Sequence, residues 1–251
     1  MKKSIFSLVA FLLFGLMSLN AQSRMKVHLT DGTVSIFSIA NIDHIDWDDE
    51  TATYEDITIN GTTYHLGVSG AIDLGLSVKW AAFNVGATAP SDYGDYYAWG
   101  ETETKTTYDW STYLDSPNRD GNSFTKYAVD KQTQLDPEDD VAHVKWGGDW
   151  HMPTKAEQDE LRLKCGWVWT TYGGHNGYVV IGSTGNAIFL PAAGFRGGSS
   201  LVTDGSYGHF ASSSLYEGNV GNAYVLFFSS DNISRRYGQR RNGQSVRPVC
   251  P

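Results

Sequence analysis

The sequence predicts an α+β domain made mostly of short strands and aromatic loops, with few helices. Aromatic residues make up 13% of the 251 residues, and 27 glycines are spread along the chain. Clear helix signals are concentrated in one stretch, residues 150–165. This composition is typical of a folded, loop-rich protein and argues against a disordered chain.

That stretch predicts a helix of about three turns. Thr154 and Glu157 have the spacing of a capping box, in which each side chain binds a free N–H of the first turn. Pro153 stops any strand before the helix because it has no backbone N–H to donate. We expect Gly166 to end the helix in the left-handed conformation. A strand over residues 167–169 should follow.

Residues 1–21 are predicted to be a secretory signal peptide. Lys2 and Lys3 precede an apolar run over residues 5–19, and Ala21 is a small residue suited to cleavage. A membrane anchor is the alternative, but the run is short for a bilayer span. We therefore expect an exported protein (cell surface, outer membrane or extracellular) without a transmembrane segment after cleavage.

Residues 22–66 are predicted to form a small β module and linker. One hairpin is expected over residues 24–39 with its turn at Asp31-Gly32, and a second over residues 54–66 with its turn at Asn60-Gly61. Five acidic residues lie between the two hairpins: Asp43, Asp46, Asp48, Asp49 and Glu50. A solvated linker explains them better than a cation site, because metal loops place their ligands around a glycine.

Residues 67–251 are predicted to form the main domain. The expected strands cover residues 72–86, 93–101, 178–181, 187–190, 223–228 and 245–250. Residues 102–135 should form a long ordered loop whose aromatic side chains are packed. Asp136 and Pro137 predict the start of a short helix. Residues 197–214 are expected to be a glycine- and serine-rich loop.

Five ordered motifs in this domain resemble the Fibrobacter succinogenes major paralogous domain family. They are DLGLSVKW (73–80), GDYYAWGE (94–101), WGGDWHMPT (146–154), FLPAAG (189–194) and SVRPVC (245–250). The resemblance covers residues 71–251 and implies a C-type-lectin-like fold, related to that of formylglycine-generating enzyme, in an exported protein. His151 and Gln158 depart from the family pattern, and both departures could loosen the packing around the central helix.

The resemblance also bears on the two cysteines, Cys165 and Cys250. Formylglycine-generating relatives use a cysteine pair as a catalytic copper site, whereas these two stand at a helix end and in the last strand. Lectin-like folds often join a helix to the last strand, so we expect a disulfide between Cys165 and Cys250 in an oxidising compartment. The calcium-binding triplets of sugar-binding lectins are absent from the sequence.

No catalytic, cofactor or metal site is predicted. The seven histidines show no metal-ligand spacing, and no glycine-rich phosphate loop opens a helix. The net charge of −9, which becomes −11 without Lys2 and Lys3, argues against general nucleic-acid binding.

Residues 229–244 are predicted to be a loop that binds a ligand. The segment carries four arginines and a tyrosine, and no acid follows Asp231. Tyrosine and arginine give large contact area at modest entropic cost. The candidate ligand-binding residues are Ser230, Asp231, Asn232, Arg235, Arg236, Tyr237, Gln239, Arg240, Arg241 and Asn242.

The alternative for this segment is a solvated loop that balances the acidic surface. Its end also resembles the variable region of retroelement-diversified surface proteins. Three functions therefore stay open: a non-catalytic binding or adhesin-like protein whose partner is a protein or glycan at the cell surface, an enzyme related to formylglycine-generating oxidases, and a structural surface component without a specific ligand.

Overall fold

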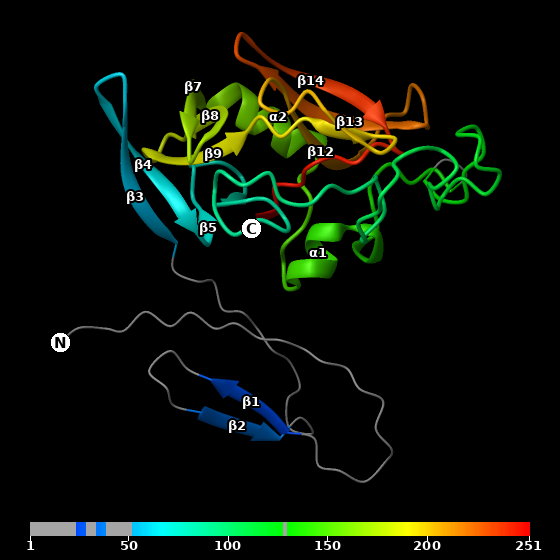
Figure 1. The fold of residues 1–251 in the computed structure, drawn as a ribbon, viewed down its shortest axis with the longest axis horizontal. Helices are drawn as coiled ribbons and strands as arrows, with labels where there is room; N and C mark the ends of the chain where they lie inside the picture. The colour runs from blue at the N-terminus through cyan, green and yellow to red at the C-terminus, as the bar shows by residue number, and fades with distance from the viewer. Residues whose placement is uncertain (1–23, 29–33, 39–51, 128–129) are drawn as a thin grey trace. The chain divides into compact units, whose positions relative to one another are not determined.

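The computed structural model describes residues 24–28, 34–38, 52–127 and 130–251 (Figure 1). The chain divides into two compact units, one up to Trp47 and one from Asp48 onward. In the first unit, β1 (Arg24–His28) pairs antiparallel with β2 (Val34–Ser38), which confirms the first predicted hairpin. Its turn, the expected signal peptide and the acidic residues 43–50 lie outside the described residues.

The second unit is α+β, and its largest sheet has five strands in the order β3-β4-β9-β8-β7. The strands are β3 (Thr53–Ile59), β4 (Thr62–Ser69), β7 (Gly166–Tyr172), β8 (His175–Ile181) and β9 (Asn186–Pro191). The hairpin β3–β4 joins this sheet because β4 pairs in parallel with β9 at His65 and Leu66. A domain boundary at residue 67 is therefore wrong: this hairpin belongs to the main unit, which starts near Asp48.

The turn between β3 and β4 follows from its sequence. Asn60 and Gly61 both have positive φ, 51° and 81°. This pair of conformations gives the turn the twist that matches two antiparallel strands. The second predicted hairpin is therefore confirmed, and its second strand continues beyond residue 66 to Ser69.

Smaller sheets complete the main unit. They have the orders β12-β13-β14, β15-β6-β5 and β10-β11. Their strands are β5 (Ala71–Ile72), β6 (Lys79–Ala81), β10 (Phe195–Gly197), β11 (Ser200–Val202), β12 (Gly208–Leu215), β13 (Asn222–Ser229), β14 (Asn232–Gln239) and β15 (Val249–Cys250).

Two parts of the predicted strand pattern need correction. The expected loop over residues 197–214 contains β11 and most of β12, whose small residues fit a buried strand. The expected strand over residues 93–101 is mostly irregular and pairs only through a bridge from Tyr97 to Gln244. Closely packed glycines and serines look like a loop in sequence, although in β12 they let the strand pack tightly.

The predicted central helix is confirmed as α2 (Lys155–Lys164), and both hydrogen bonds of its capping box are present. Gly166, however, begins β7 and has no positive φ, so it does not end the helix as predicted. The chain turns into extended backbone at Cys165 (φ −98°, ψ 155°). Helix α2 packs against the sheet β12-β13-β14.

A short helix before α2 is also present, but with a different cap. Asp136 precedes the 3-10 helix η2 (Pro137–Asp139) and makes no side-chain cap bond. Asp140 caps α1 (Val141–Trp146) and also accepts hydrogen bonds from the backbone N–H of Met152, at 2.8 and 3.0 Å. One buried carboxylate thus joins α1 to the segment that leads into α2.

His151 and Gln158, the two residues that differ from the motif of the resembled family, both have partners in the structure. Gln158 is 2% exposed, and its amide nitrogen donates to the carbonyl oxygens of Phe210 and Ala211 at 3.0 and 3.1 Å. His151 faces Glu157 across 3.6 Å and is bridged through its backbone to Val249. Gln158 therefore ties α2 to β12 through its amide nitrogen, whereas its buried Oε1 has no hydrogen-bond partner among the described residues.

Residues 102–127 and 130–135 form an ordered segment, as predicted. Tyr113, Phe124 and Tyr127 are buried, and Tyr113 donates to the carbonyl of Trp99 at 2.7 Å. Much of this segment's packing is aromatic, because Trp110 meets Tyr113 and Phe124 edge to face.

Arg247 lies at the centre of the main unit with 0% exposure. Its guanidinium donates to Asn84 Oδ1 and to three main-chain carbonyls, those of Ala81, Ala82 and Phe189, at 2.8–3.1 Å. Burial lowers its pKa to about 9, and the donating N–H groups keep it cationic at neutral pH. The side chain links β6, β9 and the segment before β15.

Among the residues that the structure describes, no helix is long and apolar enough to cross a membrane.

Candidate functional site

The predicted binding segment is a hairpin rather than a loop. Residues 232–239 form β14, which pairs along its whole length with β13. The prediction failed because polar side chains on an edge strand resemble a loop in sequence. Since successive side chains of a strand point to opposite faces, the candidate residues do not form one surface.

One face of the hairpin carries a cluster of tyrosines. Tyr237 is 57% exposed and stacks on Tyr216, with ring centroids 4.3 Å apart and planes 2° apart. Tyr216 meets Tyr224 edge to face at 5.4 Å, and Tyr224 lies directly across from Tyr237 in the sheet. The result is a preformed aromatic surface with Tyr237 outermost.

Cations surround this tyrosine cluster. The ammonium of Lys155, at the start of α2, lies 4.8 Å from the Tyr224 ring centre, and the Arg235 guanidinium lies 5.3 Å from it. Arg235 pairs with Asp159, and Arg162 shares the same carboxylate at 3.0 Å. Three cations therefore accompany one carboxylate, so this face carries local positive charge on an acidic chain. We call Tyr216, Tyr224, Tyr237, Lys155 and Arg235 the tyrosine face.

The opposite face of β14 carries Arg236. Its guanidinium lies 3.5 Å from the Phe227 ring centre, and Phe227 also packs against Tyr207 and His209. Burial, and then the charge of Arg236, lower the pKa of His209 to about 4, so His209 is neutral at physiological pH. Arg236 and Arg235 thus belong to different surfaces.

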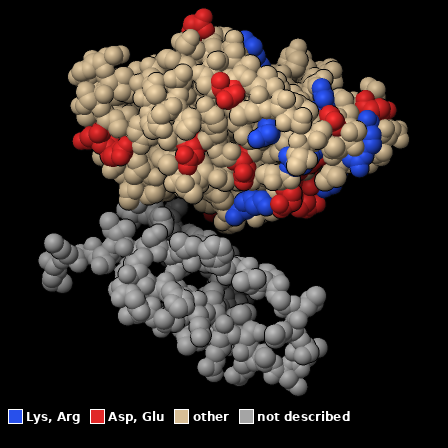
Figure 2. All heavy atoms as spheres, in the orientation of Figure 1, with Lys and Arg blue, Asp and Glu red and all other residues tan. Residues whose placement is uncertain are grey.

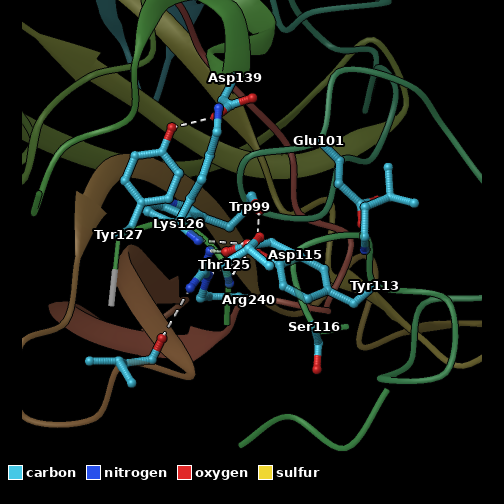
Figure 3. Close-up of polar contacts among 12 residues, drawn as sticks. Trp99, Glu101, Tyr113, Asp115, Ser116, Thr125, Lys126, Tyr127, Asp139 and Arg240 are labelled. Carbon is cyan, nitrogen blue, oxygen red and sulfur yellow. Dashed lines mark hydrogen bonds and ion pairs between the residues drawn. The ribbon is translucent and has the colours of Figure 1, made fainter. Parts of the chain in front are cut away.

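Arg240 is not a surface residue, and its expected role in ligand binding is wrong. It is 1% exposed, its Nε donates to the Tyr113 hydroxyl at 2.8 Å, and it pairs with Asp115. Figure 3 shows its guanidinium pointing toward Asp115 beneath the rings of the neighbouring aromatic residues. The Trp99 and Phe124 ring centres both lie 4.6 Å away.

The contacts of Arg240 with Tyr113, Asp115, Phe124 and Tyr127 therefore hold residues 113–127 of the long segment in place. Asp115 binds Arg240 and also accepts from the backbone N–H groups of Thr125 and Lys126, each at 2.9 Å. An aromatic cage favours a cation through the ring quadrupoles, and the carboxylate neutralises it. Burial raises the pKa of Tyr113, which keeps its hydroxyl protonated.

The remaining candidates lie at the two ends of β14. Ser230 and Asp231 form the β13–β14 turn, in which Asp231 accepts from the Ser229 hydroxyl, and Asn232 begins β14. At the other end, the Arg241 Nε donates to Gln239 at 2.8 Å, and Asn242 closes the turn with its backbone N–H. Of these residues, Gln239 shares the face of β14 that carries Arg235 and Tyr237, whereas Ser230 and Asp231 lie in the turn at the far end of the strand.

The two cysteines lie in different elements. Cys165 follows α2 and is half-buried, whereas Cys250 is buried in β15. The structure does not join them. Burial, and then the charge of Glu160, raise the pKa of the Cys165 thiol to about 11. The disulfide stays a prediction, which mass spectrometry of unreduced peptides would test.

On the face drawn in Figure 2, charges of both signs lie side by side. In Figure 2, Lys, Arg, Asp and Glu are interspersed, and most of the visible surface is uncharged. Within the described part of the chain, no three His, Cys, Asp or Glu side chains are grouped closely enough to hold a metal ion.

Sequence reasoning missed Tyr216, Tyr224 and Lys155. The sequence predicts Tyr224 in a strand and Lys155 in a helix, and neither prediction gives the residue a role in binding. The partial signal was the alternation of β13, which places Tyr224, Leu226 and Phe228 on one face. The approach of α2 to that face is a tertiary contact without a sequence signal.

Comparison with known proteins gave no match to a family model, a curated protein or a solved structure.

Proposed function

We propose that this is an exported, non-catalytic binding protein of C-type-lectin-like fold that holds an acidic ligand on its tyrosine face. The observation that carries the proposal is the exposed Tyr237 ring, held flat on Tyr216 beside Lys155 and Arg235. Large exposed aromatic side chains backed by other rings are typical of contact surfaces, because they lose little entropy on binding.

The rigidity of the surface supports this proposal. Strand β14 is hydrogen-bonded to β13 from Asn232 to Gln239, and Arg235 is also held by Asp159 on α2. A surface that is already ordered has a smaller entropic cost of binding. The tyrosine face should therefore bind without rearrangement of the hairpin.

Charge indicates the class of ligand. Lys155 has no acidic partner among the described residues, and Arg235 and Arg162 share a single carboxylate. Partners with carboxylate, sulfate or phosphate groups complement this surface. Binding should weaken with added salt, because exposed charges are screened beyond about 8 Å at physiological ionic strength.

A screen with a matched control tests the proposal. The protein is applied to arrays of acidic and neutral glycans and to a panel of cell-surface proteins. The Lys155→Gln/Arg235→Gln variant removes two cations from the tyrosine face, whereas Arg236→Gln/Arg241→Gln removes two from elsewhere in the hairpin. Tyr237→Ala removes the exposed ring alone.

The first double variant and Tyr237→Ala should lose binding to acidic ligands, while the control keeps it. Melting temperatures should stay within a few degrees, since exposed substitutions typically change stability by about 0.5 kcal/mol or less. Equal loss in the control would show that binding depends on general charge and would overturn the assignment of the tyrosine face. Full binding by all three variants would place the contact surface elsewhere.

Export rests on residues 1–21, which lie outside the described residues. N-terminal sequencing of the protein from cell envelopes or medium should start at Gln22. An intact Met1 on the mature protein would contradict export by cleavage.

A further inference from the structure

A cavity of about 290 Å³ opens beside helix α1, away from the residues that form the tyrosine face. Its walls come from three segments, residues 85–86, residues 95–104 and the last turn of α1. The lining residues are Val85, Gly86, Asp95, Tyr97, Glu103, Thr104, Lys145 and Trp146. This volume suits a small organic group rather than a single ion.

One carboxylate in this cavity lacks a cation. Asp95 accepts from the Tyr97 hydroxyl at 3.3 Å and has no ion-pair partner among the described residues. Gly86 makes room for it: a Cβ on Gly86, whose φ is 79°, would lie 2.4 Å from the Asp95 carboxylate oxygen. The missing side chain therefore lets the carboxylate sit at the cavity wall.

An aromatic wall stands in the same cavity. The Trp146 ring meets Trp150 and Phe83 edge to face, at 5.0 and 5.9 Å, so its plane is fixed by packing. Tyr97 is 4% exposed and held by backbone hydrogen bonds with Gln244. A packed indole ring and a carboxylate that line the same cavity are groups that attract organic cations.

Two further charged residues line the cavity and contribute to its net charge. Lys145 pairs with Glu103 at 2.6 Å, so these two neutralise each other. Asp95 is then the uncompensated charge, and the cavity is net negative. An anionic ligand would meet this repulsion, and the described residues do not group the three carboxylate, histidine or cysteine ligands that a metal ion would need.

We propose that this cavity binds an organic cation, an alkylammonium group on an apolar stem, with the nitrogen at Asp95 and the stem on Trp146. The site is independent of the tyrosine face, so either can fail without the other.

The probe is n-butylammonium chloride, titrated into the ¹⁵N-labelled protein with NaCl used to match ionic strength. The readout is the indole N–H signal of Trp146, which is identified by its loss in Trp146→Phe. Butan-1-ol serves as the neutral analogue and pentanoate as the anionic one. The signal should shift and saturate with butylammonium and shift little with either analogue.

Three variants test the roles of the charges. Asp95→Asn should weaken butylammonium binding about fivefold or more, because it removes the charged acceptor. Lys145→Gln should tighten binding about two- to fivefold, because it removes a competing cation from an exposed pair. Glu217→Gln, which removes one exposed carboxylate from the β12–β13 turn, should change nothing.

Equal shifts with butan-1-ol would mean an apolar pocket only and would overturn the proposal, as would the absence of any saturating shift. Unchanged affinity in Asp95→Asn would overturn it as well. If Asp95→Asn fails to fold, the test rests on Lys145→Gln, which leaves the core unchanged. Weaker or equal binding of butylammonium by Lys145→Gln would then contradict the assignment of the cavity.

Discussion

Two arginines among the described residues are fully buried, and they are held in opposite ways. Arg247 donates to three main-chain carbonyls and one amide oxygen, and no carboxylate of the described residues is bound to it. Arg240 pairs with a carboxylate, Asp115, and lies among four aromatic rings. The first is surrounded by backbone and the second by side chains.

The difference teaches what each arginine stabilises. The partners of Arg247 are Ala81 at the end of β6, Ala82 and Asn84 just after it, and Phe189 in β9, so this arginine holds together segments that are far apart in sequence. The partners of Arg240 lie mostly in residues 99–127, so it fixes one long irregular segment against the hairpin β13–β14. Removing Arg247 should damage the whole unit, whereas removing Arg240 should free one segment.

The largest effect is expected for Arg247→Met. Methionine fills much of the volume but leaves four buried acceptors without a donor, and each such group costs about 1–3 kcal/mol. Relief from burying the charge offsets part of this cost. We expect the free energy of unfolding to fall by about 3 kcal/mol or more, measured by urea denaturation.

Arg236→Met is the matched control for this prediction. It makes the same substitution on the exposed face of β14 and should change stability by about 0.5 kcal/mol or less. If Arg247→Met were as stable as this control, the hydrogen bonds from Arg247 to the three carbonyls would contribute nothing to the free energy of unfolding. The contrast with Arg240 would then disappear.

A smaller and more local effect is expected for Arg240→Met. Loss of the ion pair with Asp115 and of the aromatic contacts should lower the free energy of unfolding by about 2 kcal/mol. Trypsin should then cut the segment of residues 102–135 faster, at Arg119 or Lys126, while the rest of the unit stays intact. Asp115→Asn should produce the same cleavage pattern, and uniform cleavage along the chain would contradict the local role.

The smallest effect on stability is expected for the half-buried His151, whose charge depends on the pH. Glu157, 3.6 Å away, raises the pKa of His151 against the opposing effect of burial. Because the pKa of His151 is raised in the folded state, its pair with Glu157 contributes its full stabilisation of the fold below the unfolded pKa of about 6.5. This stabilisation is lost as the pH rises through the folded pKa of His151.

The stability difference between the wild type and His151→Gln should therefore be about 0.5 kcal/mol at pH 6 and should shrink toward pH 8. Urea denaturation at several pH values measures it. Glu157→Gln should abolish the same pH dependence, and a difference that grows with pH would show that the pair does not act as described.

Local features of the fold could be predicted from the sequence, because their causes are local. The turn at Asn60-Gly61 needs two positive φ angles, and the capping box of α2 needs only Thr154 and Glu157. The packed aromatic segment of residues 102–135 was also expected, since aromatic side chains in a polar segment need a place to pack. Each of these signals lies within a few residues of the structure that it predicts.

Long-range features could not be predicted. The parallel pairing of His65 with Asn186 decides where the main unit begins, and neither strand carries a mark of its partner. The candidate site failed for the same reason. Three arginines of this segment look alike in sequence but have different environments. Arg235 lies on the tyrosine face and Arg236 lies on the opposite face. Arg240 is buried and pairs with Asp115, which is 125 residues earlier in the chain.

The pairing of β6 with β15 has a consequence for the order of folding. Trp80 faces Val249 in this sheet, and Ala81 donates to the carbonyl of Pro248. Contacts between residues so far apart in the chain form slowly, because the intervening loop must close before they stabilise anything. As the chain is synthesised, the sheet β15-β6-β5 stays incomplete until residues 249–250 are available, so the pairing of Trp80 with Val249 is among the last contacts that the chain can form.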